Sequence, residues 1–260
     1  TLGARFFDRL GRQVALTPSG EALLAAADGI LARLDSLMQE LGDLAGAQAG
    51  MLRIGASQVV GVYILPGLLA AFRREHPGVR LSVRVEPARR IGELVAAGEL
   101  DVGLVGEGAL GDDPRLERRP VHRDELLVIV PRGHVLADLP SVSAASLARL
   151  PFLLPRLDSA SSRSLIEQLS AEGIRLESVL ELGNVGAVKR AVEAGMGISV
   201  ASRFAVQREL DDGRLRAVRV AGLDLERRIA LCWPRGQAPS PACAAFMELA
   251  AGAWPQPVES

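Results

Sequence analysis

Aromatic residues are scarce in this chain of 260 residues, at 3%, although hydrophobic residues make up 48%. The core must therefore consist mainly of leucine, valine, alanine and isoleucine, the side chains that fill layers of helices and strands. The length is sufficient for two compact domains. We therefore expect an α/β fold.

Cysteine and histidine are also rare. The chain has two cysteines, Cys232 and Cys243, and three histidines, His76, His122 and His134, which lie far apart in the sequence. This inventory contains neither a disulfide framework nor the spacing of metal ligands. No serine or cysteine has an evident histidine and carboxylate partner. We therefore expect a reducing compartment, no metal, no cofactor and no catalytic site.

An excess of one charge and long apolar runs are lacking as well. The net charge is −1 and the pI is about 6.3, which excludes a generally basic nucleic-acid-binding surface, so any DNA contact must be local. No run of 18 apolar residues is present, and residues 1–12 lack the apolar segment of a signal peptide. We expect a cytoplasmic protein without membrane contact.

A heptad pattern of apolar residues runs through residues 18–47. The spacings alternate between four and three, and the charged residues fall off this stripe, as in the seam of a coiled coil. Packing on the same chain is one alternative, but such a long helix with a sustained heptad favours pairing with a second copy. We therefore assign residues 18–49 to a linker helix that dimerises through Leu23, Ile30, Leu34, Leu37, Leu41 and Leu44.

Residues 1–17 are too few to fold alone. A Gly-Arg turn followed by alternating apolar residues predicts a small β-hairpin over residues 9–16. Thr17 is expected to be the N-cap of the long helix, with Pro18 at its first position. Three arginines of this segment are available for DNA phosphates: Arg5, Arg9 and Arg12.

From residue 51 onward, apolar strands alternate with helical segments. Strands are expected at 52–56, 80–86, 101–105, 126–131, 152–154, 179–181, 198–201 and 229–233, and helices at 66–75, 90–97, 165–172, 185–194 and 241–252. This alternation predicts βαβ units and a mostly parallel sheet, which binds ligands at the carboxyl ends of its strands. Four residues follow such ends: Ser57, Gln58, Ala88 and Gly106.

The segment LGARFFDRLGRQVALTPSGEALL, residues 2–24, is similar to the wing and the start of the linker helix of LysR-type transcriptional regulators. In that family a helix-turn-helix with the recognition helix comes first, which would lie before Thr1. The resemblance extends to the end of the chain. It implies an α/β effector-binding domain of two Rossmann-like lobes, of the type 2 periplasmic-binding-protein kind.

On this resemblance we divide the chain into three parts. Residues 1–17 are a wing remnant of a winged helix-turn-helix, residues 18–49 are the linker helix, and residues 50–260 are the effector-binding domain. Lobe I is expected at about 51–123 plus 234–260 and lobe II at about 124–233. The chain would cross between the lobes near residues 122–124 and return near Trp233.

A glycine-rich stretch, Gly106 to Gly111, has the form GxGxxG after an expected strand. The next residues, Asp-Asp-Pro at 112–114, do not suit a helix start, and Glu107 and the two aspartates would repel phosphate. We therefore expect a surface turn beside the cleft rather than a nucleotide site.

Residues 156–163, RLDSASSR, lie between an expected strand and an expected helix. Serines and arginines at a helix N-terminus suit an anion. The alternative, weighed equally, is that the serines only cap the helix and the arginines face solvent. The segment resembles REPGSGTR of the LysR branch that includes regulators of carbon fixation and sulfur assimilation. This resemblance implies effector binding by Arg156, Ser162 and Arg163, whereas residues 157 and 159–161 depart from the pattern.

Residues 184–192, NVGAVKRAV, resemble the SxEAIKxAV segment of the same branch. The resemblance implies that Asn184 faces the cleft, and its alternative role is the N-cap of the next helix. Lys189, the single lysine, is expected at the surface.

We interpret the chain as a LysR-type regulator that senses a small anionic metabolite between its lobes. The expected partners are promoter DNA for the full-length protein, the effector, and further copies in a homodimer or homotetramer. The alternative is a stand-alone solute-binding protein of a transporter. Such a receptor should carry a signal or lipid anchor and should not need a heptad helix.

Overall fold

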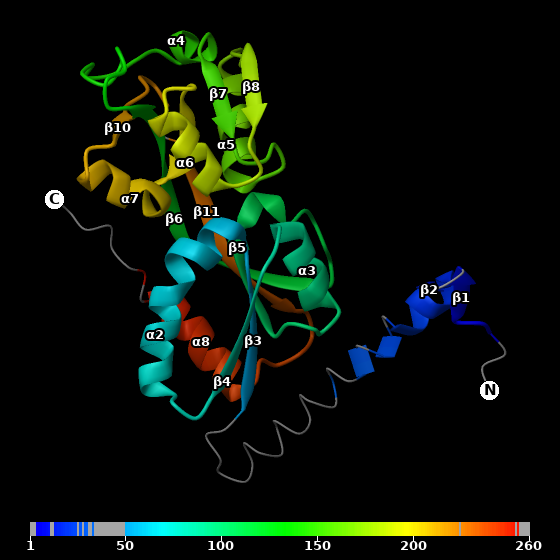
Figure 1. The fold of residues 1–260 in the computed structure, drawn as a ribbon. Helices are drawn as coiled ribbons and strands as arrows, with labels where there is room; N and C mark the ends of the chain where they lie inside the picture. The colour runs from blue at the N-terminus through cyan, green and yellow to red at the C-terminus, as the bar shows by residue number, and fades with distance from the viewer. Residues whose placement is uncertain are drawn as a thin grey trace.

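The computed structural model describes residues 4–10, 13–24, 26–27, 29–30, 33, 50–223, 225–252 and 254. Figure 1 shows two α/β lobes, one above the other, with the N-terminal hairpin lying to the side of the lower lobe. We call the lower one, with residues 51–115 and 235–252, lobe I. The upper one, with residues 132–225, is lobe II, and two long strands join the lobes.

The N-terminal segment forms the expected hairpin. Strand β1 (Phe7–Leu10) pairs antiparallel with β2 (Gln13–Leu16), and the hairpin starts two residues earlier than expected because Phe7 pairs with Leu16. The Oγ1 atom of Thr17 accepts the N–H of Gly20 at 3.0 Å, which confirms the N-cap of the following helix. Some predicted residues lie outside the described ones: Arg12 of the predicted DNA contacts, and the seam residues Leu34, Leu37, Leu41 and Leu44.

Lobe I is built on three parallel strands. Strand β3 (Met51–Ala56) lies between β4 (Arg80–Val85) and β5 (Val102–Gly106). A π-helical turn, η1 (Val60–Ile64), leads into α2 (Leu65–Glu75), which packs with α8 (Pro241–Gly252) on one face of the sheet. Helix α3 (Ala88–Ala96) buries Ile91, Leu94 and Val95 against the other face. Helices therefore cover the sheet on both sides (Figure 1).

Lobe II combines four helices with short strands. Strand β7 (Pro151–Leu154) runs parallel to β8 (Ser178–Glu181), while β9 (Ser199–Ser202) and β10 (Leu215–Val218) pair with a joining strand. The helices are α4 (Ala144–Ala148), α5 (Ala160–Ala171), α6 (Val185–Glu193) and α7 (Arg203–Asp211). Ser159 caps α5 by accepting the N–H of Ser162, and glycine at 195, with φ of +78°, follows α6. These local signals set where each helix begins and ends.

Two antiparallel strands join the lobes: β6 (Leu116–Pro131) and β11 (Glu226–Pro234). Arg227 lies opposite Asp124 in this pair, whereas Trp233 lies opposite Glu117 and packs against the lobe I core. The return crossing is therefore closer to Arg227 than to Trp233. The register shifts between residues 229 and 230, a bulge of the kind that bends a strand pair.

The joint sheet has seven strands in the order β10-β6-β11-β5-β3-β4, with β9 beside β6. Because β11 pairs antiparallel with both β5 and β6, the expectation of a mostly parallel sheet is wrong for this sheet. The reason is that β11 returns directly beside β6, without the helical crossover that parallel neighbours require. Strand β6 also begins ten residues earlier than the expected 126, and α7 and β10 were not expected from the sequence.

Candidate functional site

A cavity of about 270 Å³ lies between the lobes, at the end of the sheet where the strands stop. Its wall includes residues at the starts of four helices. They are Gln58 of the helix that leads into η1 and α2, Ala88 of α3, the N-cap residue Ser159 of α5, and Val185 of α6. The first N–H groups of a helix have no partner within the helix and carry partial positive charge. Helix N-termini that converge in this way favour a negatively charged group in the cavity.

The lobe I wall contains Ser57, Gln58 and Ala88, all of them expected site residues. In the described part of the chain, the side chains of Ser57 and Gln58 make no hydrogen bond, so both are available to a ligand. Helix α3 starts after Pro87 without a side-chain cap. No N-cap side chain therefore occupies its first N–H groups, and its first residue, Ala88, lies in the cavity wall.

The lobe II wall contains Arg156, Asp158 and Ser159. The Arg156 guanidinium donates two hydrogen bonds to the Asp158 carboxylate, at 2.8 and 2.7 Å. These bonds lower the pKa of Asp158 and raise that of Arg156, so both groups are charged at neutral pH. The Asp158 carboxylate therefore takes up two of the hydrogen-bond donors of Arg156 that an anionic ligand would contact. The pair is exposed, so breaking it costs only about 0–1 kcal/mol.

Arg227 contributes a buried positive charge that sequence reasoning missed. It lines the cavity, is 8% exposed, and donates from Nε to Asp124 at 2.8 Å. Its Nη2 atom is 2.6 Å from the same carboxylate but not aligned for a hydrogen bond. Asp124 is completely buried and also accepts from the hydroxyl of Ser202 at 2.8 Å. The predicted strand began only at residue 229, so nothing in the sequence marked Arg227 as facing a cleft.

Four expected site residues lie outside the cavity wall. Gly106 is the buried last residue of β5. Ser162 is 1% exposed and exchanges hydrogen bonds with Ser159, and Arg163 donates to the main-chain oxygen of Asp158. Asn184 caps α6 by accepting the N–H of Ala187 at 2.9 Å. The capping role given as the alternative is therefore present, with Ser159 as the N-cap of α5 and Asn184 as the N-cap of α6. The wall next to Asn184 is formed by its neighbours, residues 183 and 185.

Two further expectations are corrected. The glycine-rich stretch does lie beside the cleft, but it forms a short helix, η2 (Glu107–Ala109), whose Ala109 and Leu110 are buried. It is therefore more than a surface turn. Lys189 is not at the surface: its side chain is 11% exposed and is paired with Glu209 at 2.8 Å. A charged partner within reach makes this burial possible.

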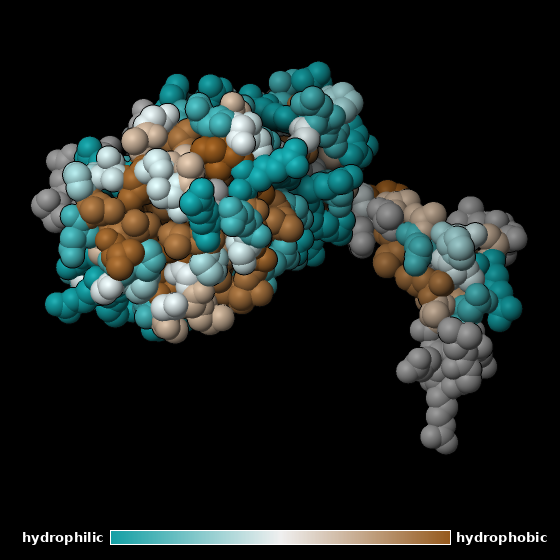
Figure 2. Space-filling view, turned by 90° about the horizontal axis from the view of Figure 1, so that it is seen from above, coloured by the Kyte–Doolittle hydropathy of each residue, from teal (hydrophilic) through white to brown (hydrophobic). Residues whose placement is uncertain are grey.

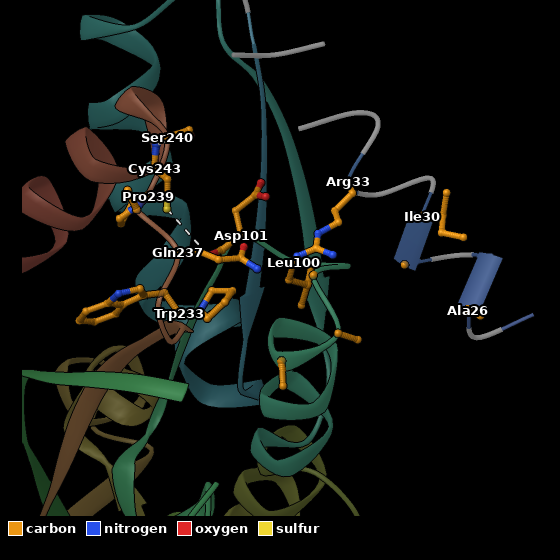
Figure 3. A pocket seen from close by; sticks show the side chains of 16 residues that line it. Ala26, Ile30, Arg33, Leu100, Asp101, Trp233, Gln237, Pro239, Ser240 and Cys243 are labelled. Carbon is orange, nitrogen blue, oxygen red and sulfur yellow. Dashed lines mark hydrogen bonds between the residues drawn. The ribbon is translucent and has the colours of Figure 1, made fainter. Parts of the chain in front are cut away.

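A second cavity, of about 430 Å³, lies between the N-terminal helix and lobe I. Figure 3 shows Ile30 and Arg33 on the helix side and Asp101 and Gln237 on the lobe side. The Asp101 carboxylate is already paired with Arg53 at 3.0 Å. The wall of this cavity includes the start of α8 and the end of α3. A helix start carries partial positive charge and a helix end carries partial negative charge. It therefore lacks the convergence of helix N-termini that is found at the interlobe cavity.

The described residues contain no cluster of three or more histidine, cysteine, aspartate or glutamate side chains placed to hold a metal ion. Among the helices described, none is both long enough and apolar enough to cross a membrane.

Two α/β lobes, joined by two strands and enclosing a cavity, define an effector-binding domain of the type 2 periplasmic-binding-protein kind. Residues 45–255 match the LysR substrate binding domain. The chain belongs to the LysR family of transcriptional regulators.

Curated relatives support this assignment over most of the chain. A protein of Cyanidioschyzon merolae named "Probable RuBisCO transcriptional regulator" is 37% identical over 235 residues, which cover 88% of this chain and 77% of the relative. A protein of the same name from Nostoc is 33% identical over 253 residues, covering 95% of this chain and 74% of the relative. These relatives are named as transcriptional regulators, and not as enzymes or as solute-binding proteins of transporters.

Solved structures share the fold. OxyR of Corynebacterium glutamicum superposes with a TM-score of 0.73 at 21% identity and covers 96% of this chain and 77% of its own. The regulatory domain of Synechocystis CcmR, solved in complex with 2-PG, has a TM-score of 0.70 at 24% identity, covering 77% of this chain and 95% of its own. The cofactor-binding domain of the Cbl transcriptional regulator has a TM-score of 0.72 at 25% identity and covers 79% and 89%.

Proposed function

We propose that this LysR-type regulator binds a small anionic metabolite in the interlobe cavity and transmits its presence to promoter DNA in the full-length protein. The observation that carries the proposal is the convergence of four helix N-termini on one cavity of about 270 Å³. Ser57, Gln58 and the first N–H groups of α3 would hold the ligand from lobe I, and Arg156 and Ser159 from lobe II. A ligand that contacts both lobes favours one lobe arrangement over others.

A thermal-shift screen tests this proposal. Suitable compounds are inorganic phosphate, sulfate, small carboxylates and 2-PG, the compound bound by CcmR. A ligand at a hundredfold excess over its Kd should stabilise the fold by about 2.7 kcal/mol. The shift should disappear in Ser57→Ala with Arg156→Met and persist in Ser141→Ala, an exposed serine outside the cavity. A stabiliser that acts equally on the double variant would place the site elsewhere.

We also propose that the N-terminal helix joins two copies of the chain. Large apolar side chains on this segment are exposed, with Leu23 at 40% and Ile30 at 68%. Figure 2 shows apolar residues gathered on the N-terminal segment, apart from the body of the molecule. Burying each leucine or isoleucine side chain stabilises association by roughly 1.5–3 kcal/mol. A homodimer through the helix, or a homotetramer of such dimers, would cover this stripe.

Light scattering on Leu23→Glu with Ile30→Glu tests the second proposal. The variant should have a smaller mass than the unmodified chain, because a charge in the seam is left against apolar side chains of the partner. Ser19→Glu places the same charge off the stripe and should leave the mass unchanged. An unchanged mass in the double variant would mean that other surfaces hold the oligomer.

We further propose that the wing segment contacts only the phosphate backbone of DNA. Arg5 is exposed and Arg9 lies on β1, whereas Arg12, the third predicted contact, lies outside the described residues. Arginines on phosphates add affinity without sequence discrimination, which requires contacts to base edges. In a mobility-shift assay, this chain should bind DNA weakly and lose binding to random competitor. Binding that survives competitor would show that the chain itself reads sequence.

A further inference from the structure

Beside the cleft, the aromatic ring of Tyr63 in lobe I contacts Lys189 in lobe II. Tyr63 belongs to η1 of lobe I, yet it packs with Val59 against apolar residues of lobe II. The Nζ atom of Lys189, on α6 of lobe II, lies 4.9 Å from the centre of the Tyr63 ring. A lysine at this distance from a ring is attracted to it, and more strongly where water is excluded.

The lysine is held in a fixed direction. Its Nζ lies 2.8 Å from the Glu209 carboxylate in an ion pair and donates a hydrogen bond to the main-chain oxygen of Ala205 at 2.7 Å; both partners are on α7. Lys189 and Glu209 side chains are each 11% exposed. A buried ion pair contributes little to stability by itself, because desolvation offsets the attraction, but it does set one geometry. The ammonium group can thus present its remaining side to the ring.

The helices joined in this way are those that form the cleft. The helix carrying Tyr63 begins at Gln58, and α6, which carries Lys189, begins at Val185; both residues line the interlobe cavity. The π-helical turn at Tyr63 is a geometry found frequently at functional sites. If the distance between the two helix starts changes, the lobes must therefore either rotate about the Tyr63–Lys189 contact or break it.

We propose that Lys189 and Tyr63 are positioning residues: their contact fixes the spacing of the two lobes, and so of the helix N-termini on either side of the ligand cleft. The inference deepens the proposed function, but its test reads the lobe spacing without any ligand. A failure to find an anionic ligand and a failure of this contact are therefore separate results.

The first measurement uses the fact that the chain has a single lysine and a single tyrosine. An Arg74→Lys change adds an exposed reference lysine on α2. With an amine-reactive ester and peptide mapping, Lys189 should react far more slowly than the reference. Tyr63→Leu should accelerate labelling of Lys189 by about threefold to thirtyfold, the range that loss of a cation–π contact supports, whereas Tyr63→Phe should not.

The second measurement reads the lobes themselves. Nitroxide labels on Arg74→Cys in lobe I and Arg175→Cys in lobe II report the interlobe distance by pulsed electron resonance. The native Cys232 and Cys243 should stay unlabelled, because burial raises the pKa of both thiols to about 12. Tyr63→Leu should shift or broaden the distance distribution, whereas Tyr63→Phe, which keeps the aromatic ring, should leave the distribution unchanged.

A further variant, Lys189→Met with Glu209→Gln, removes both charges and avoids leaving one buried without a partner. It should change the distance distribution as Tyr63→Leu does. The proposal is overturned if Lys189 reacts as fast as the reference lysine in the unmodified background. It is equally overturned if Tyr63→Leu has the same labelling rate and the same distances as Tyr63→Phe.

Discussion

Asp124→Asn should be the most destabilising single substitution at the junction of the lobes. The Asp124 side chain is completely buried, and its carboxylate receives hydrogen bonds from Arg227 at 2.8 Å and from Ser202 at 2.8 Å. An amide leaves the Arg227 charge, itself 8% exposed, without a counter-charge. Breaking one side of a buried pair costs about 3–5 kcal/mol.

The expected effect is large enough to measure by thermal or urea unfolding followed by circular dichroism. For a domain of this size, about 3–5 kcal/mol corresponds to a melting temperature lower by roughly 6–20 °C. The control is Arg123→Gln, which breaks the neighbouring Arg123–Glu226 pair. That pair is exposed, with side chains at 70% and 43%, and should contribute about 0–1 kcal/mol.

A second comparison separates charge from packing. Asp124→Leu with Arg227→Met removes both partners, so it should recover much of the stability lost in Asp124→Asn, because apolar side chains of similar volume often replace buried pairs without loss. If Asp124→Asn unfolds within about 1 kcal/mol of the unmodified chain, the pair behaves like a surface pair and the reasoning fails.

Three other predictions concern pH, backbone space and thiol reactivity. Burial lowers the pKa of His122, which stacks on Trp254 at 4.4 Å between ring centres, and Asp124 opposes this shift only in part. Because His122 has a lower pKa in the folded chain, the unfolded chain binds more protons near this pKa. The free energy of unfolding should therefore fall as the pH drops below about 6.5. This component should vanish in a urea titration of His122→Phe; an unaltered slope would assign it to other groups. A Cβ at Gly197 would lie 2.3 Å from the main-chain oxygen of Pro151, so Gly197→Ala should be strongly destabilising. Gly67→Ala, where nothing lies within 4 Å, should instead stabilise α2 by about 0.5–1 kcal/mol; equal melting temperatures for the two variants would contradict this. Cys232 and Cys243, both buried, should react with a thiol reagent only after unfolding, and rapid reaction of the native protein would show that one of them opens to solvent.

The positions of most strands and helices were predictable from the sequence. Alternating or continuous apolar residues predicted the strands around Ile54 and Leu104, and α8 was predicted with the bounds observed. Helix starts followed from capping residues, with Thr17 and Asn184 both serving as N-caps. These predictions succeeded because periodicity and capping depend on residues within a few positions of one another.

The elements that were missed are those whose local pattern is weak. The first half of β6, from Leu116 to Glu125, is rich in charged residues. It is a strand because β11 pairs with it along this whole length. Helix α7 is likewise rich in charged residues, with four in nine positions. Pairing with a distant segment overrides local preference in such places.

The sequence by itself determined the family resemblance, most of the secondary structure and four of the cleft-lining residues, Ser57, Gln58, Ala88 and Arg156. Only the tertiary structure decided which helix starts meet in one cavity, that Arg227 faces it, and that Lys189 lies buried against Tyr63. The reason is physical: these partners lie on different elements, and burial, charge pairing and ring contact depend on distances that the chain acquires only when its two lobes have folded together.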